Sequence, residues 1–277
     1  MDKCEIFRLI ASQVAQAELA FPTGVQVALK VRDALDDEDC QLTGAARLIQ
    51  AEPLLASRVI AIANSVVYNR SGQAVTEVKA ALSMLGFSTV RSLAMALVTR
   101  QMAGQSSDPQ HRELLAKLWE HTAHVAALAH AIARHVTHQN PESALFAAIV
   151  HDIGGFYMLS RAAEFPQLLM GDFSEWIESG EVLVGRAVLA RLAVPDAVSA
   201  VLEEFWEGYL AMPPVTLADT LLLAEDLSPV ASPLHHIAGV DEGRAAALEI
   251  LIGEEMLSRI LTEAAEEVAS LTRALQC

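Results

Sequence analysis

Helical spacing of apolar residues is the feature that most restricts how this chain can fold. Near the N-terminus, the residues that share one side of a helix are Ile6, Leu9, Ile10, Val14 and Leu19. Apolar residues that recur every three or four positions mark one face of an α-helix, whereas a half-buried strand alternates with a period of two. We find neither a convincing alternating pattern nor a fixed-period repeat in the sequence. The sequence therefore predicts an all-α fold.

Proline, glycine and polar turns divide the chain into helices of ordinary length. We expect helices over residues 5–20, 25–35, 42–50, 53–62, 75–84, 88–102, 112–136, 141–152, 156–163, 174–192, 194–206 and 215–227, and one or two more over 241–275. The segment 104–109 is small and polar and ends in proline, which marks it as a linker. We therefore divide the chain into an N-terminal helical half (1–105), a second helical half (106–230) and a C-terminal helical extension (231–277).

The composition restricts the partners and the compartment of the protein. The chain carries 19 basic and 35 acidic residues, a net charge of −16, so its surface repels nucleic-acid phosphates and anionic membranes. The sequence lacks an apolar run long enough to span a bilayer, and its first residues do not resemble a signal peptide. Cys4, Cys40 and Cys277 are scattered and odd in number, which indicates free thiols in a reducing compartment. We therefore expect a cytoplasmic protein that binds neither nucleic acid nor membrane.

An apolar run, 144–150, ends at the adjacent residues His151 and Asp152 and is followed by two glycines. Thirty residues upstream, His121 lies within an apolar helical seam. Neutral imidazoles and carboxylates are ligands that divalent metals accept, so these residues are candidates for a metal site. Taken alone, however, His121 is more simply a hydrogen-bonded core histidine, and His151 and Asp152 could equally be a structural dyad at a helix end.

Two further histidines lie on the same predicted helix as His121. His124 falls on the flank of the apolar seam, and His130 points well away from it. We therefore expect both side chains at the surface.

Several segments resemble the HDOD domain of bacterial signalling proteins. The stretch 48–65 has the acidic-Pro-Leu start and the Ala-Asn-Ser helix end of that pattern, and 78–91 carries its Leu-Gly element followed by an arginine. The segments 118–122 and 147–154 fit the second half of the family pattern. The resemblance covers about residues 10–230. It implies a multi-helix HDOD fold, in which an N-terminal helical subdomain packs on a second subdomain related to HD metal-dependent phosphohydrolases.

The resemblance also implies a ligand set. His121, His151 and Asp152 match three of the four positions of the HD pattern and would bind a divalent metal, such as iron, manganese or zinc. The fourth ligand would come from a later helix. Glu225 stands where the family places an aspartate, while Asp219 has the family's Leu-Ala-Asp letters but lies six residues early. Both remain candidates.

Two departures from active HD-type phosphodiesterases decide the function that we expect. Gly155 replaces a lysine that would contact phosphate, and the segment 203–210 lacks a histidine pair and ends in Gly-Tyr-Leu instead of Gly-Tyr-Pro. We therefore expect a stand-alone, non-catalytic signal-transduction module that binds signalling proteins in trans. The alternatives are a metal-dependent phosphohydrolase acting on a nucleotide or phosphodiester, and a nucleotide-binding sensor that keeps the pocket without the chemistry. The sequence leaves the oligomeric state open.

Overall fold

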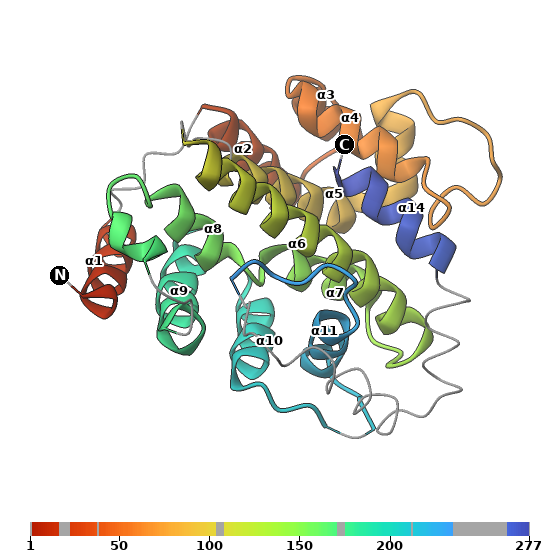
Figure 1. The fold of residues 1–277 in the computed structure, drawn as a ribbon. Helices are drawn as coiled ribbons and strands as arrows, with labels where there is room; N and C mark the ends of the chain where they lie inside the picture. The colour runs from red at the N-terminus through yellow and green to blue at the C-terminus, as the bar shows by residue number, and fades with distance from the viewer. Residues whose placement is uncertain are drawn as a thin grey trace.

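The computed structural model describes residues 2–16, 23–37, 39–103, 108–170, 175–211, 213–234 and 265–276. Within these ranges the chain is helical, with connecting turns and loops and no strand, so the all-α prediction is confirmed (Figure 1). The first half comprises α1 (Lys3–Ala15), α2 (Thr23–Asp36), α3 (Leu42–Gln50), α4 (Pro53–Ala63) and α5 (Val78–Ala103). The second comprises α6 (Pro109–His135), α7 (Pro141–Val150), α8 (Ile153–Ser160), the short turns η1 (Pro166–Leu169) and η2 (Trp176–Gly180), α9 (Glu181–Arg191), α10 (Asp196–Glu207) and α11 (Leu217–Asp226). The last helix is α14 (Ala265–Gln276).

Most helix boundaries lie at the proline, glycine and polar turn residues of the sequence. Asp108 and Asn140 each precede a proline and cap the helix that follows, since their side chains accept hydrogen bonds from backbone N–H groups of the first turn. These two helices, α6 and α7, carry the candidate histidines. The final predicted helical region, 241–275, lies outside the described residues as far as 264, and α14 forms within its remainder.

The break predicted between residues 84 and 88 lies inside a single element, helix α5. Gly86 has a positive φ of 77° between the helical segments that the sequence predicts at 75–84 and 88–102, and α5 is kinked there. Glycine tolerates this backbone region because it lacks a Cβ. The kink lets the second part of α5 run through the interior, where residues 93–98 are all buried.

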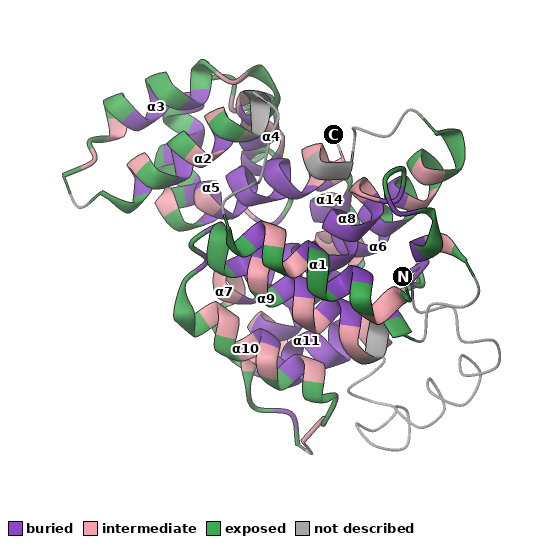
Figure 2. Cartoon of the chain, turned by 90° about the vertical axis from the view of Figure 1, so that its left-hand side faces the viewer, coloured by how far each residue is buried: buried purple, intermediate pink, exposed green. Residues whose placement is uncertain are grey.

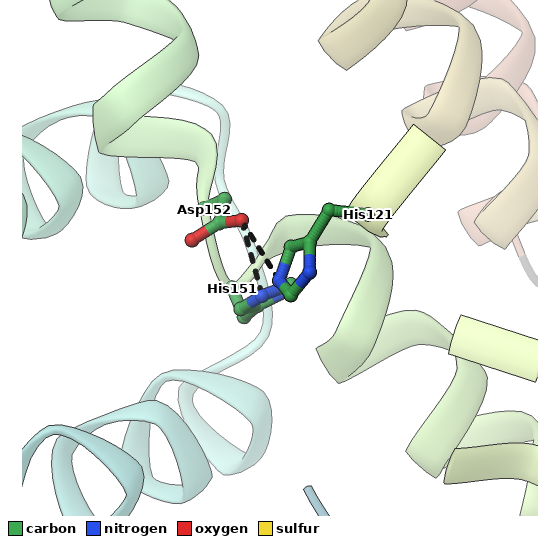
Figure 3. A group of neighbouring side chains, drawn as sticks. All are labelled: His121, His151 and Asp152. Atoms are coloured by element: carbon green, nitrogen blue, oxygen red, sulfur yellow. Dashed lines mark ion pairs between the residues drawn. The ribbon is translucent and has the colours of Figure 1, made fainter. Parts of the chain in front are cut away.

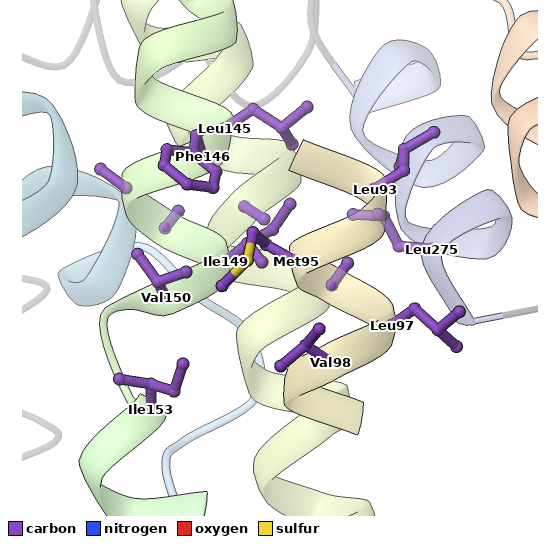
Figure 4. Close-up of a cluster of buried hydrophobic side chains, with 14 of the residues drawn as sticks. Leu93, Met95, Leu97, Val98, Leu145, Phe146, Ile149, Val150, Ile153 and Leu275 are labelled. Carbon is purple, nitrogen blue, oxygen red and sulfur yellow. The ribbon is translucent and has the colours of Figure 1, made fainter. Parts of the chain in front are cut away.

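The core is continuous across both halves of the chain. Side chains of α5 meet those of α7 at its centre, and Leu275 of α14 lies beside them (Figure 4). Both ends of the described chain pack onto the second half, since α1 lies against α9 and α14 lies against α6 and α4. The boundaries that we predict at 105 and 230 remain a prediction, because no separate core marks them.

The expectation that no apolar run is long enough to span a bilayer is wrong by length and composition, because two helical stretches pass that test, Val78–Gln101 and Pro141–Ser160. Their most apolar windows are 67% and 89% buried inside the fold. Figure 2 shows the same pattern, with buried residues concentrated in the central helices and exposed ones on the outer turns. Packing against other helices therefore explains their apolar composition, as in the core helices of a soluble domain.

Close approach of two helices depends on glycine. A Cβ on Gly154 would lie 2.8 Å from the carbonyl oxygen of Glu181 and from the amide nitrogen of Gly185, so α8 and α9 meet backbone to backbone. The first of the two glycines after Asp152 therefore permits this close approach. The contact orients the start of α8, where Asp152 lies.

Candidate metal centre

Three successive helices deliver the candidate ligands to one point. His121 lies in the middle of α6, His151 follows the last residue of α7, and Asp152 precedes the first residue of α8. All three are 1–2% exposed. The tight turn between α7 and α8 directs the last two side chains toward His121 (Figure 3). Glu225, near the end of α11, completes the group, which we call the metal cluster.

The facing atoms of the metal cluster lie within a few ångströms of one another. Nε2 of His151 lies 3.2 Å from Oδ2 of Asp152 and 3.4 Å from Oε2 of Glu225. Nε2 of His121 lies 3.1 Å from Oε2 of Glu225 and 3.7 Å from Oδ2 of Asp152. The ligand atoms of His121, His151 and Asp152 all lie within 4.8 Å of one another. Two imidazole nitrogens and two carboxylate oxygens therefore surround a common centre.

Backbone carbonyls hold both imidazoles in this orientation. Nδ1 of His121 lies 2.7 Å from the carbonyl oxygen of Val230, and Nδ1 of His151 lies 2.6 Å from that of Ala148. Because a carbonyl oxygen only accepts hydrogen bonds, each Nδ1 must be the donor. In the neutral imidazoles the lone pair is then on Nε2, which faces the cluster. Metal-binding histidines in proteins commonly have this outer hydrogen bond.

Nε2 of His121 shares a hydrogen bond with Oε2 of Glu225 at 3.1 Å, but two other inner atoms of the cluster are not satisfied in this way. Neither Nε2 of His151 nor Oδ2 of Asp152 has a hydrogen-bond partner among the residues that the structure describes, although both are buried. Buried polar atoms without a partner carry an energetic cost and require an explanation. A cation would accept both lone pairs at once, so the residues fit a bound metal ion.

The carboxylates of the cluster favour the protonated form of both histidines when no cation is bound. Burial disfavours the imidazolium form of His151, but the carboxylates of Asp152 and Glu225 outweigh it and raise its pKa well above the usual value. The pKa of His121 is raised in the same way, with Glu225 as the main opposing charge. Burial alone would raise the pKa of Asp152, yet the two histidines hold it below its usual value. With neutral imidazoles the cluster carries two negative charges, which a divalent cation would neutralise.

Of the two carboxylates that the sequence leaves open, the structure brings Glu225 to the cluster and holds Asp219 elsewhere. Asp219 lies in the first turn of α11 and forms a capping box with Thr216. Its oxygens accept hydrogen bonds from the backbone N–H groups of Ala211, Val215 and Thr216 at 2.9–3.0 Å. Burial would raise the pKa of Asp219, but these donors lower it. Its carboxylate stabilises the start of the helix.

The expectation for His130 is wrong. Its side chain is buried, because α6 is covered on this side as well. It belongs to a second polar group, the Glu142 cluster, which consists of the buried Thr89 and His130 and the half-buried Tyr68 and Glu142. His124 is half-buried, and its Nδ1 bonds to the carbonyl oxygen of Glu120 one turn earlier.

The Glu142 cluster was missed because its members come from separate parts of the chain. Tyr68 follows α4, Thr89 lies on α5, His130 on α6 and Glu142 in the first turn of α7. The Tyr68 hydroxyl donates to Oε1 of Glu142 at 2.6 Å, and the Thr89 hydroxyl lies 2.8 Å from Oε2. Local sequence gives no sign of such a meeting. A glutamate at the start of an apolar helix is more simply explained by the helix dipole.

The segment 203–210, which departs from the HD pattern, contributes no ligand to the metal cluster. Glu203 forms a surface ion pair with Arg186, and Tyr209 is 77% exposed. Phe205 is the residue of this segment that approaches the cluster, with its ring edge-on to His151 at 5.7 Å between centroids. The segment therefore supplies an apolar wall to the cluster.

Comparison with known proteins identifies the family to which the chain belongs. The HDOD domain model matches residues 21–179, more than half of the chain. No curated protein matches the sequence. A "putative metal-dependent phosphohydrolase" from Shewanella amazonensis SB2B has a similar crystal structure, with a TM-score of 0.72 and 21% identity over 98% of both chains.

Two further crystal structures share the fold. An HDOD domain protein with unknown function from Geobacter sulfurreducens gives a TM-score of 0.62 at 18% identity, over 99% of this chain and 98% of that one. A "putative signal transduction protein" from Marinobacter aquaeolei VT8 gives 0.58 at 17% identity, over 100% of this chain and 67% of that one. Identities this low show the shared fold and leave the activity open. The family match and the resemblance in sequence agree: this chain belongs to the HDOD domain family.

Proposed function

We propose that this protein is a signal-transduction module that holds one divalent cation in the metal cluster and acts by binding other proteins, without turnover. The observation that carries the proposal is the convergence of His121, His151, Asp152 and Glu225 on one centre, with the unsatisfied atoms of His151 and Asp152 facing inward. Iron, manganese and zinc all accept imidazole and carboxylate ligands. In bound form such an ion could also polarise water or a phosphate oxygen.

The enclosure of the cluster supports a role without turnover. The side chains of His121, His151 and Asp152 are at most 1% exposed, and that of Glu225 is 13% exposed. A catalytic metal keeps one coordination position open to water or substrate. Gly155 supplies no cation to bind a phosphate. An enclosed ion without such a group is suited to hold helices α6, α7, α8 and α11 together.

The signal would pass through a protein partner in trans, in the cytoplasm. The net charge of −16 favours a partner with a basic contact surface, since complementary charges speed association and exclude wrong partners.

Metal analysis tests this proposal. The protein, purified without added metal, should contain near-stoichiometric iron, manganese or zinc, and the His151→Ala variant should contain none. A folded wild-type protein that neither contains metal nor binds added manganese would refute the metal centre. The Asp219→Asn variant is the control, because Asp219 lies outside the cluster and its substitution should leave the metal in place.

The ligand set favours a second candidate, a metal-dependent phosphohydrolase acting on a nucleotide or phosphodiester. Two histidines and two carboxylates are the ligand types that such enzymes use. Hydrolysis of an aryl phosphodiester with added manganese would show it, provided that His151→Ala abolishes the activity. Activity that survives this substitution would come from another site or a contaminant.

A further inference from the structure

Residues 228–234 follow α11 and contact the metal cluster at His121. Val230 contributes the carbonyl oxygen that accepts the hydrogen bond from Nδ1 of His121 at 2.7 Å. The Ser228 hydroxyl donates to the same oxygen at 2.9 Å, which fixes its position. Ser232 and Leu234 are 2% and 0% exposed, although they lie in a loop. The loop is therefore packed into the fold beside His121, with Ser232 and Leu234 directed inward.

Leu234 fills the space that Gly155 leaves empty. A Cβ on Gly155 would overlap Cδ1 of Leu234 and would lie 3.6 Å from Cδ2 of Leu118. Gly155 comes three residues after the ligand Asp152, and Leu118 lies one turn before the ligand His121. Leu234 therefore packs at the junction of the two elements that carry the ligands. Any side chain at position 155 would have to displace it.

We propose that residues 228–234 form an intrachain plug, which closes the metal cluster when Leu234 packs against Gly155 and opens it when Leu234 leaves. The inference rests on the proposed function for the identity of the ligand, a divalent cation, but the plug itself is defined by packing. The closed position of the plug is coupled to the metal cluster through the hydrogen bond between His121 and Val230. The same imidazole faces the cluster with Nε2 and Val230 with Nδ1, so an ion bound at Nε2 would hold the ring in the orientation that meets the Val230 carbonyl.

The plug would connect occupancy of the metal site to the signalling role that we propose. A bound cation would favour the closed plug further, and loss of the cation would make its opening more frequent. The plug is continuous with the C-terminal extension, whose last helix, α14, packs against α4 and α6. Occupancy of the site can thus alter the surface that a partner meets.

Thiol labelling measures the opening of the plug. The native residues Cys4, Cys40 and Cys277 are first replaced by serine, and Ser232→Cys then places one small, buried reporter inside the plug. Ser65→Cys in the same background is the matched control, because Ser65 is also buried (3% exposed) but lies after α4. Labelling rates with an aromatic disulfide report how often each thiol becomes exposed.

In the first arm, Gly155→Ala is added to both reporter proteins in metal-free buffer. We expect labelling to be at least tenfold faster at position 232 and unchanged at position 65, because the new methyl group displaces Leu234. Leu234→Ala should have the same effect without adding any atom at position 155. Equal labelling rates at position 232 with and without these substitutions would overturn the plug.

In the second arm, saturating manganese should slow labelling at position 232 at least tenfold, and His121→Gln should remove this effect. If manganese binds, as shown by calorimetry, and labelling does not change, the coupling through His121 is refuted. If manganese does not bind at all, the proposed metal centre fails, while the first arm still decides whether the plug exists.

Discussion

Two groups that pair a buried histidine with a carboxylate lie along helices α6 and α7, and they differ in how their polar atoms are satisfied. In the Glu142 cluster, both carboxylate oxygens accept hydrogen bonds, from Tyr68 and Thr89, and His130 lies 3.6 Å away. In the metal cluster, Nε2 of His151 and Oδ2 of Asp152 lack such partners within the described chain. The same residue types on the same helices therefore differ in hydrogen-bond satisfaction, and the two unsatisfied atoms mark the metal cluster as the candidate ligand-binding site.

The largest expected difference concerns metal affinity. Glu225→Gln removes a negative ligand atom, so we expect affinity for manganese to fall by more than the roughly 10–100-fold that loss of an outer-shell partner costs. Calorimetric titration measures it. Asp219→Asn should keep wild-type affinity, although an amide cannot accept three N–H bonds as a carboxylate does, which should cost about 2 kcal/mol of stability. A comparable affinity loss in both variants would contradict the assignment of Glu225.

Substitutions in the Glu142 cluster should lower the stability of the protein and leave its metal affinity unchanged. Glu142→Ala leaves the hydroxyl of Tyr68 without its acceptor and removes the carboxylate beside Thr89 and His130. We expect the free energy of unfolding to fall by about 2–4 kcal/mol, since each buried unsatisfied group costs roughly 1–3 kcal/mol. Urea unfolding at neutral pH measures it. If Glu142→Ala also abolished metal binding in the folded protein, the two clusters would not be separate.

A milder substitution tests one contact of the Glu142 cluster. Tyr68→Phe keeps the ring, which lies 6.1 Å from that of His130 between centroids, and removes only the hydroxyl. Loss of a hydrogen bond to a charged acceptor should destabilise the protein by about 1–2 kcal/mol. The result is read by urea unfolding. An unchanged free energy of unfolding would mean that Thr89 alone satisfies the carboxylate.

The smallest expected effect is a dependence on pH. Burial would raise the pKa of Glu142, but hydrogen bonds from His130, Tyr68 and Thr89 lower it below its usual value. A carboxyl group whose pKa is lower in the folded state stabilises the protein above its unfolded pKa, near 4.3, and loses this contribution as the pH falls through the folded pKa. The stability gap between wild type and Glu142→Gln should therefore narrow below about pH 4.

Glu113 provides the matched control for this pH series. Its pKa is also lowered, by a hydrogen bond and ion pair with Lys117 at 2.9 Å, but both side chains are well exposed. Solvent and salt screen such a pair, so Glu113→Gln should differ little from wild type at any pH. At neutral pH, the difference in free energy of unfolding from wild type should be larger for Glu142→Gln than for Glu113→Gln. Equal differences would show that the Glu142 cluster contributes no more than a surface ion pair.

The sequence predicts the elements of this fold more completely than it predicts the site. Helical periodicity, the prolines after Asp108 and Asn140, and Gly86 mark helices that the structure contains. His130 was assigned to the surface because it lies half a turn from the apolar seam of α6. The structure buries it because other helices cover that side too, which depends on contacts between distant segments.

The choice between Asp219 and Glu225 shows the same limit. Six residues place them on different sides of one helix, and only the direction in which α11 packs decides which carboxylate faces the histidines. One local signal was available, however. Thr216 stands three residues before Asp219, the spacing of a capping box, which assigns Asp219 to the helix start.

Helix α7 connects the two clusters, and its polarity matches both. Glu142 lies in its first turn and His151 just beyond its last, nine residues apart, or about 14 Å along a helix. The aligned peptide dipoles of a helix favour negative charge at the N-terminus and positive charge at the C-terminus. The direction in which this short helix runs therefore suits an anionic side chain at one end and a cation at the other. Reversing it would place each charge against the field.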